Sequence, residues 1–157
     1  MEQVIMKFPE WTRVAEVELI YKSKVKASER PVIRSSNDTY NVLRQIWDQN
    51  KIELFEEFKV LLLNRGNKVI GVYDVSKGGI TGTVADPRLI LATAIKALAV
   101  SIILSHNHPS GNLKPSRADE ELTTKIKEAA KYFDIRVVDH IIVSENGYYS
   151  FADEGIL

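Results

Sequence analysis

The chain has 157 residues, of which 45% are hydrophobic and 27% charged, and this fits one domain with a substantial core better than two small ones. Twenty-one basic residues balance twenty-one acidic ones, so the sequence lacks the basic excess of a dedicated nucleic-acid-binding protein. Because the sequence has no cysteine, disulfides, thiolate zinc sites, iron–sulfur clusters and a cysteine nucleophile are excluded. Any metal must be held by nitrogen and oxygen atoms.

The amino-terminal residues lack the basic start and long apolar run of a secretory signal. The most apolar stretch, residues 89–104, is interrupted by Lys96 and Ser101. It is also shorter than the run of about 20 apolar residues that a membrane-spanning helix needs. We therefore expect a cytoplasmic protein without a membrane span.

The first third of the chain predicts one strand, a linker and one helix. Residues 1–35 contain an alternating apolar and polar run over 14–21, which is typical of a strand, and then a basic stretch that suits a linker. Asn37 and Asp38 are good helix caps, and apolar residues follow them at helical spacing. This pattern predicts an amphipathic helix over about 38–49.

The middle of the chain contains the clearest hairpin pattern. Two apolar segments, 58–63 and 68–75, are separated by a short stretch whose asparagines and glycine suit a tight turn. The glycine-rich segment 76–83 has too few bulky residues for a helix and predicts a flexible bend. The pair Asp86 and Pro87 then combines a helix cap with a first-turn proline, and predicts a helix.

The last third predicts strands around one further helix. Ser116 and Asp119 have the spacing of a capping box, and apolar residues at helical period continue the pattern to about residue 132. Strands are expected over 100–104, 136–143 and 148–151. An order of strands with inserted helices indicates an α/β fold, with helices flanking a mixed β-sheet.

Two of the three histidines, His106 and His108, stand directly after the apolar strand 100–104. In an extended chain residues i and i+2 point the same way, so the two imidazoles should face one spot. Asp119, in the first turn of the next helix, can add a carboxylate oxygen. Three nitrogen or oxygen ligands with an open fourth position are typical of a catalytic zinc.

The spacing of these residues resembles the JAMM (JAB1/MPN) metalloprotease motif. His106-Asn107-His108 is followed by seven residues, Ser116, two residues and Asp119. Together with segments 75–79 and 147–155, the motif looks like the RadC-like family, often described as DNA repair proteins, over residues 36–157. The resemblance implies a JAB/MPN domain of the cytidine-deaminase-like kind that holds one zinc ion, preceded by residues 1–35 as a strand and linker.

The resemblance also implies roles for individual residues. His106, His108 and Asp119 would bind Zn²⁺ with water as the fourth ligand, and Ser116 would help to stabilise the oxyanion. The family motif needs an upstream glutamate as general base, and Glu56 and Glu57 are both candidates. The family places this glutamate two residues before the aromatic residue that opens the strand, which selects Glu56, with Glu57 as the alternative.

These observations predict a zinc-dependent hydrolase that cuts a peptide or isopeptide bond in a peptide or protein substrate. One alternative is a DNA-repair accessory protein, although the helix-hairpin-helix region of longer RadC-like proteins is not expected in the 35 residues before the domain. Another is a JAB fold without catalysis that serves in protein contacts. His140, inside an apolar strand, is predicted to be a buried core histidine outside the site. The sequence does not determine an oligomeric state, although an unpaired edge strand would make a homodimer plausible.

Overall fold

The computed structural model describes residues 24–78 and 84–157. The strand expected over 14–21 lies outside the described residues, as does most of the bend expected over 76–83. The beginning of that bend was wrongly predicted, because Ser76 and Lys77 continue the preceding strand.

The fold is α/β, as predicted, and is built on a mixed five-stranded sheet in the order β2-β1-β3-β4-β5. Strands β3 and β4 are parallel, while the other neighbouring pairs are antiparallel. The strands are β1 (Glu57–Leu63), β2 (Val69–Lys77), β3 (Ser101–Asn107), β4 (Arg136–Ser144) and β5 (Gly147–Ser150). The helices are α1 (Ser36–Ile46), α2 (Pro87–Lys96) and α3 (Arg117–Lys131), preceded by a short 3-10 turn, Ala27–Glu29.

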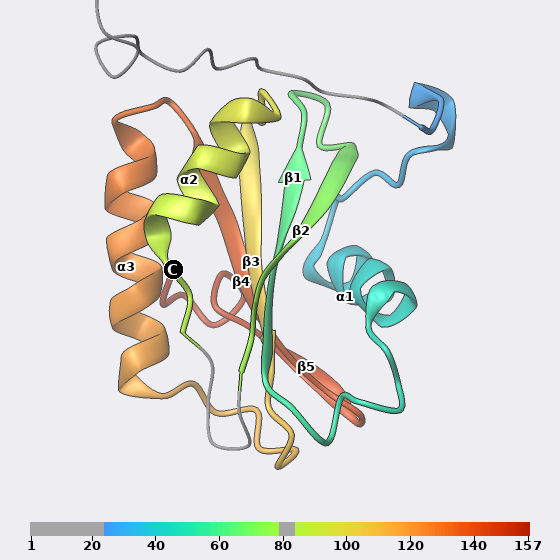
Figure 1. Cartoon of the computed structure of the whole chain (residues 1–157), viewed down its shortest axis with the longest axis vertical. Helices are drawn as coiled ribbons and strands as arrows, with labels where there is room; N and C mark the ends of the chain where they lie inside the picture. The colour runs from blue at the N-terminus through green and yellow to red at the C-terminus, as the bar shows by residue number, and fades with distance from the viewer. Residues whose placement is uncertain (1–23, 79–83) are drawn as a thin grey trace, which may run out of the picture.

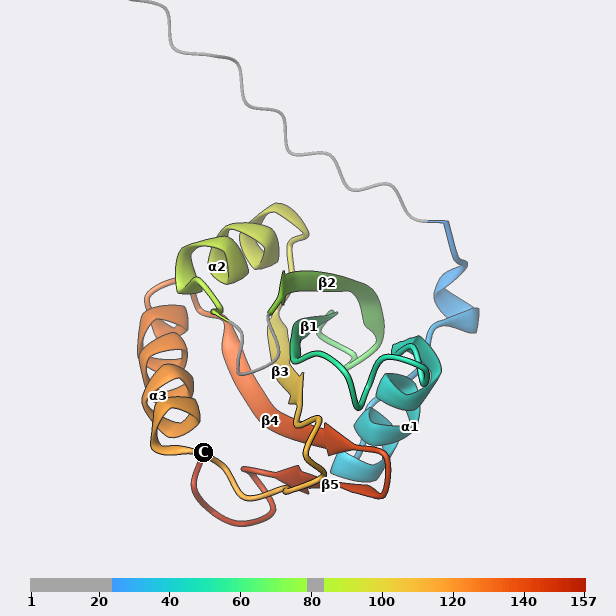
Figure 2. The same cartoon turned by 60° about the horizontal axis from the view of Figure 1, so that its bottom comes forward.

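Helices cover both faces of the sheet (Figure 1). Helices α2 and α3 lie along one face and α1 lies against the other, which is also visible from below in Figure 2. Side chains alternate between the faces along each strand. On β1, Val60 and Leu62 belong to the core under α2 and α3, whereas Leu61 and Leu63 belong to the core under α1.

The helices begin at polar caps that the sequence partly predicts. The capping box of Ser116 and Asp119 at the start of α3 is confirmed, and Asp86 caps α2 by accepting a hydrogen bond from the Arg88 amide. Helix α1 begins two residues earlier than predicted, because Ser35 is its cap and Asp38 completes the capping box as the third helical residue. It also ends earlier, at Ile46.

Strand β3 is longer than predicted and carries the histidine motif to the edge of the core. It runs to Asn107, with Phe58 of β1 opposite His106. Helix α3 is the crossover that returns the chain to pair β4 in parallel with β3, so its first turn lies beside the end of β3. Among the described residues, no helix has the length and apolar character to span a membrane.

Candidate metal centre

Three residues that could hold a metal ion come together where β3 ends and α3 begins. His106 is the next-to-last residue of β3, His108 follows the strand, and Asp119 lies in the first turn of α3. One donor atom from each lies within 4.8 Å of the others. His106 is buried, with 1% of its side chain exposed, while 17% of each of the other two side chains is exposed. The group is therefore buried at His106 and partly exposed to solvent at His108 and Asp119.

The donor atoms converge on one point. The Nε2 atoms of His106 and His108 lie 2.9 Å apart. His106 Nε2 lies 3.4 Å from Asp119 Oδ1, and His108 Nε2 lies 3.8 Å from Asp119 Oδ2. Two imidazole nitrogens and a carboxylate oxygen are a donor set that suits zinc and related divalent metals.

The hydrogen-bond partner of His108 shows which of its nitrogens is free. Its Nδ1 contacts the backbone carbonyl oxygen of Asn112, and a carbonyl oxygen only accepts hydrogen bonds. Nδ1 therefore carries a hydrogen, and in the neutral ring the lone pair is on Nε2, the atom that faces Asp119. A metal-binding histidine is typically held in this way, with its second nitrogen donating to a carbonyl group.

Asp119 combines helix capping with a second role in the site. Its Oδ2 accepts hydrogen bonds from the Ser116 amide and hydroxyl, both at 2.7 Å, while Oδ1 points toward His106. Burial raises the pKa of Asp119, but contact with the rings of His106 and His108, which donate to the carboxylate when they are protonated, outweighs it and holds the pKa well below its usual range. Contact with the Asp119 carboxylate in turn raises the pKa of His108, because the carboxylate accepts from the protonated ring. Asp119 therefore supplies a negative charge to the group.

Two buried residues, His140 and Thr123, stand behind His106, and the hydrogen bonds that connect them to it were not predicted. His106 Nδ1 lies 2.8 Å from His140 Nε2, and His140 Nδ1 lies 2.6 Å from Thr123 Oγ1. The prediction that His140 is a buried, hydrogen-bonded core histidine is confirmed, but its partner is a residue of the site. Burial lowers the pKa of His140 well below its ordinary value, and the neighbouring charge of His106 adds to this effect. A histidine within an apolar strand was the only signal in the sequence.

Glu56 lies beside the candidate metal-binding group. It lines a surface groove of about 340 Å³ together with His108, Lys114 and Ser116. Its charge contributes to the raised pKa of His108, which agrees with this placement. The carboxylate of Glu56 is therefore on the open side of the site.

The neighbouring Glu57 has a different environment. Its side chain is 9% exposed and its Oε2 lies 3.1 Å from the Nζ of Lys59. Lys59 in turn contacts Asp74 at 2.6 Å and lies over the ring of Trp47, on the face of the sheet that α1 covers. Glu57 is thus paired inside the protein with the buried Lys59, away from the groove.

Asn107, between the two histidines, fixes the segment that carries Glu56. Its side chain is fully buried and makes three hydrogen bonds. Oδ1 accepts from the Glu57 amide at 2.7 Å, and Nδ2 donates to the carbonyls of Ile52 and Phe55 at 2.6 and 2.7 Å. In the sequence Asn107 is only the residue between two histidines, because nothing local predicts contacts with residues about fifty positions earlier.

Ser116 caps α3 and also lines the groove. Its hydroxyl donates to Asp119 Oδ2 at 2.7 Å and accepts from the Asp119 amide at 3.2 Å. The capping role is thus observed, and stabilisation of an oxyanion by the same hydroxyl stays a prediction.

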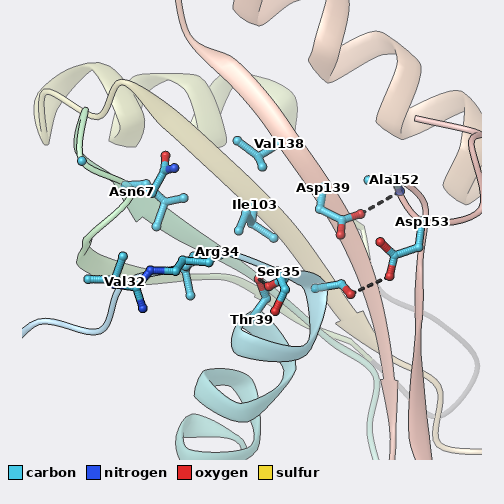
Figure 3. Close-up of a pocket in the computed structure, with 14 residues that line it drawn as sticks. Val32, Arg34, Ser35, Thr39, Asn67, Ile103, Val138, Asp139, Ala152 and Asp153 are labelled. Atoms are coloured by element: carbon cyan, nitrogen blue, oxygen red, sulfur yellow. Dashed lines mark hydrogen bonds between the residues drawn. The ribbon is translucent and has the colours of Figure 1, made fainter.

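A larger cavity, of about 650 Å³, lies on the other face of the sheet (Figure 3). Its lining includes Arg34 and Thr39 near the start of α1, Ile103 of β3, and Asp139 and Asp153. The two carboxylates already accept hydrogen bonds, from Ser150 and the Ala152 amide and from Ser36. No residue of the candidate metal-binding group lines this cavity, so its size does not make it the site.

Comparison with known proteins places this geometry in a family. A family model described as the RadC-like JAB domain matches residues 33–156. The chain belongs to the RadC-like JAB domain family. This membership agrees with the mixed sheet and with the clustering of His106, His108 and Asp119 at the end of β3.

Curated relatives of this RadC-like chain come from several bacteria, and each is named UPF0758 protein. The protein from Flavobacterium johnsoniae is 47% identical over 124 residues, which cover 79% of this chain and 53% of the relative. The protein from Porphyromonas gingivalis is 48% identical over 103 residues, covering 65% and 45%. The protein from Rubrobacter xylanophilus is 42% identical over 129 residues, covering 82% and 55%. The chain spans about half the length of the curated relatives it matches.

Proposed function

We propose that this protein is a zinc-dependent metallohydrolase of the JAMM type that cleaves a peptide or isopeptide bond. The observation that carries the proposal is the convergence of His106, His108 and Asp119, whose donor atoms lie within 4.8 Å of one another. One member of the cluster, His108, lines a groove that Glu56 also lines. A metal-binding group beside a carboxylate is the combination that metal-assisted hydrolysis needs.

The residues present fit a catalytic metal better than a structural one. They supply three ligands, and Zn²⁺ in catalytic sites keeps a fourth position for water or substrate. A zinc ion bound there would polarise the scissile carbonyl and lower the pKa of a water molecule to about 7. His108 is already held with its Nε2 lone pair toward Asp119, so binding needs no rearrangement of that ring.

Glu56 and Ser116 are the proposed catalytic residues. Glu56 would take a proton from the attacking water and deliver it to the leaving amine, which is the work of a general base followed by a general acid. Ser116 lines the same groove, and its hydroxyl would stabilise the oxyanion of the tetrahedral intermediate by turning its hydrogen away from Asp119 Oδ2, the acceptor that it has in this structure. Glu57 is less suited to the role of base, because its carboxylate is paired with Lys59 inside the protein.

The first test is the metal content of protein purified without a metal-affinity tag. We expect about one zinc per chain in the wild type and none in Asp119→Asn. The matched control is Asp38→Asn, because Asp38 completes the same kind of capping box at α1, away from the groove. A wild type that takes up no metal even when zinc is supplied would contradict the proposal.

The second test separates the two glutamates. Zinc-loaded protein is assayed against peptide and isopeptide libraries, with Glu56→Gln and Glu57→Gln beside the wild type. We expect Glu56→Gln to retain zinc and lose hydrolysis, since the amide cannot accept the proton. Hydrolysis that survives in Glu56→Gln but disappears in a stably folded Glu57→Gln would reassign the base.

A further inference from the structure

The ring of His106 is held differently from that of His108. His108 Nδ1 faces a backbone carbonyl oxygen, so this nitrogen must carry the hydrogen of the neutral ring. His106 Nδ1 instead faces Nε2 of another imidazole, that of His140, at 2.8 Å. Either nitrogen of that pair could donate. If His140 donated, the hydrogen of neutral His106 would sit on Nε2, and that atom could not bind a metal.

The hydroxyl of Thr123 resolves this choice. It donates its one hydrogen to the backbone carbonyl of Asp119, one turn earlier on α3, at 2.6 Å. It can therefore only accept from His140 Nδ1, which lies 2.6 Å away. The hydrogen of His140 is then on Nδ1, its Nε2 has a lone pair, and His106 Nδ1 must be the donor between the two rings.

Close packing around His140 and Thr123 keeps their side chains in these hydrogen-bonding positions. His140 is fully buried and its ring stacks on Phe151, with a centroid distance of 4.6 Å, while Phe58 lies edge-on at 5.6 Å. Thr123 is 3% exposed, so water does not compete for its hydroxyl. The two ring nitrogens of His140 contact the His106 ring and the Thr123 hydroxyl, so these two neighbours decide its tautomer.

We propose that Thr123 and His140 are positioning residues that hold His106 with its hydrogen on Nδ1 and its Nε2 lone pair toward Asp119. The hydrogen bonds run from His106 through His140 and Thr123 to the backbone carbonyl of Asp119, the residue whose carboxylate completes the candidate site. The inference rests on the proposed metal site for its purpose, but the tautomers themselves can be measured without metal.

The tautomer of His140 is read from the ¹⁵N chemical shifts of its ring in metal-free protein. We expect a protonated Nδ1 and an unprotonated Nε2 in the wild type. In Thr123→Val, which keeps the shape of the side chain but removes the hydroxyl, the hydrogen should shift toward Nε2. A wild-type His140 with its hydrogen on Nε2 would overturn the inference, whether or not the protein binds zinc or hydrolyses anything.

Zinc affinity is the second readout, measured by competition with a chelating dye. We expect Thr123→Val to bind zinc 10–100-fold more weakly than the wild type, as found when partners of metal-binding histidines are removed, and Thr123→Ser to recover most of the affinity. The control is Thr39→Val, because Thr39 is equally buried and donates to the Ser35 carbonyl four residues earlier, on α1. Equal zinc affinity in folded Thr123→Val and wild type would refute the positioning role.

Discussion

Adjacent glutamates at the start of β1 have opposite environments because successive residues point to opposite sides of an extended chain. Glu56 lines the groove beside His108, whereas Glu57 is buried and paired with Lys59 at 3.1 Å. One sequence position therefore separates a candidate catalytic group from a structural one.

Replacement of Lys59 by methionine should destabilise the protein strongly. The substitution leaves the carboxylate of Glu57 buried without its cation, and removing one partner of a buried ion pair typically costs about 3–5 kcal/mol. Urea denaturation measures the loss. The double variant Glu57→Gln/Lys59→Met should recover part of that stability, because no buried charge is left unpaired. Equal losses in the single and double variants would show that the missing contact of the Lys59 ammonium group with the Trp47 ring, rather than the unpaired charge of Glu57, accounts for the effect.

The sequence predicts residues of the site that are close in the chain, but not those that support them. The alternation of side chains along a strand predicts that His106 and His108 face one spot. The capping-box spacing at the start of α3 predicts that Asp119 lies in the first turn of that helix. His140 joins them only because β4 pairs with β3 so that it lies opposite Leu104. Such a pairing register depends on the whole sheet, so the local spacing of residues does not predict it.

At the scale of elements, Asn107 connects β3 to the loop before β1. Replacement of Asn107 by alanine would leave the Glu57 amide and the carbonyls of Ile52 and Phe55 without partners inside the protein. Each unsatisfied buried group costs about 1–3 kcal/mol, so we expect a loss of at least about 2 kcal/mol in the free energy of unfolding. Hydrogen exchange should show faster exchange of the Glu57 amide.

The control for Asn107 is Asn64→Ala. Asn64 also binds backbone groups, the amides of Gly66 and Lys68, but in the turn between β1 and β2, where water can replace it. We expect a smaller loss of stability there. If Asn107→Ala were as mild as Asn64→Ala, the loop that carries Glu56 would not depend on Asn107.

The boundaries of helices and strands were predicted best where a local sequence motif marks them. Ser116 and Asp119 form a capping box that the sequence displays directly. At α1 several polar residues could have been the cap, and the choice of Ser35 depends on reciprocal hydrogen bonds between it and Asp38. Strand β3 continues past residue 104 because β1 and β4 pair with its polar end, and those partners are remote in the chain.

For the whole molecule, the parallel pairing of β3 and β4 determines where the candidate site lies. The connection between these strands must cross one face of the sheet, and α3 makes this crossing with its first turn beside the end of β3. The candidate ligands therefore come from two elements, His106 and His108 from β3 and its extension and Asp119 from α3. A metal ion bound by all three would link the sheet to the helix layer.

Zinc should consequently stabilise the folded protein. A ligand that binds only the folded state at 100 times its Kd adds about 2.7 kcal/mol, which for a domain of this size raises the Tm by roughly 5–10 °C. Calorimetry with and without zinc measures the shift, and a chelator should reverse it. Asp119→Asn should lose the response, whereas Asp38→Asn, with the equivalent capping change at α1, should lower the Tm and still respond to zinc. A Tm that zinc leaves unchanged in the wild type would mean that β3 and α3 are not joined through a metal.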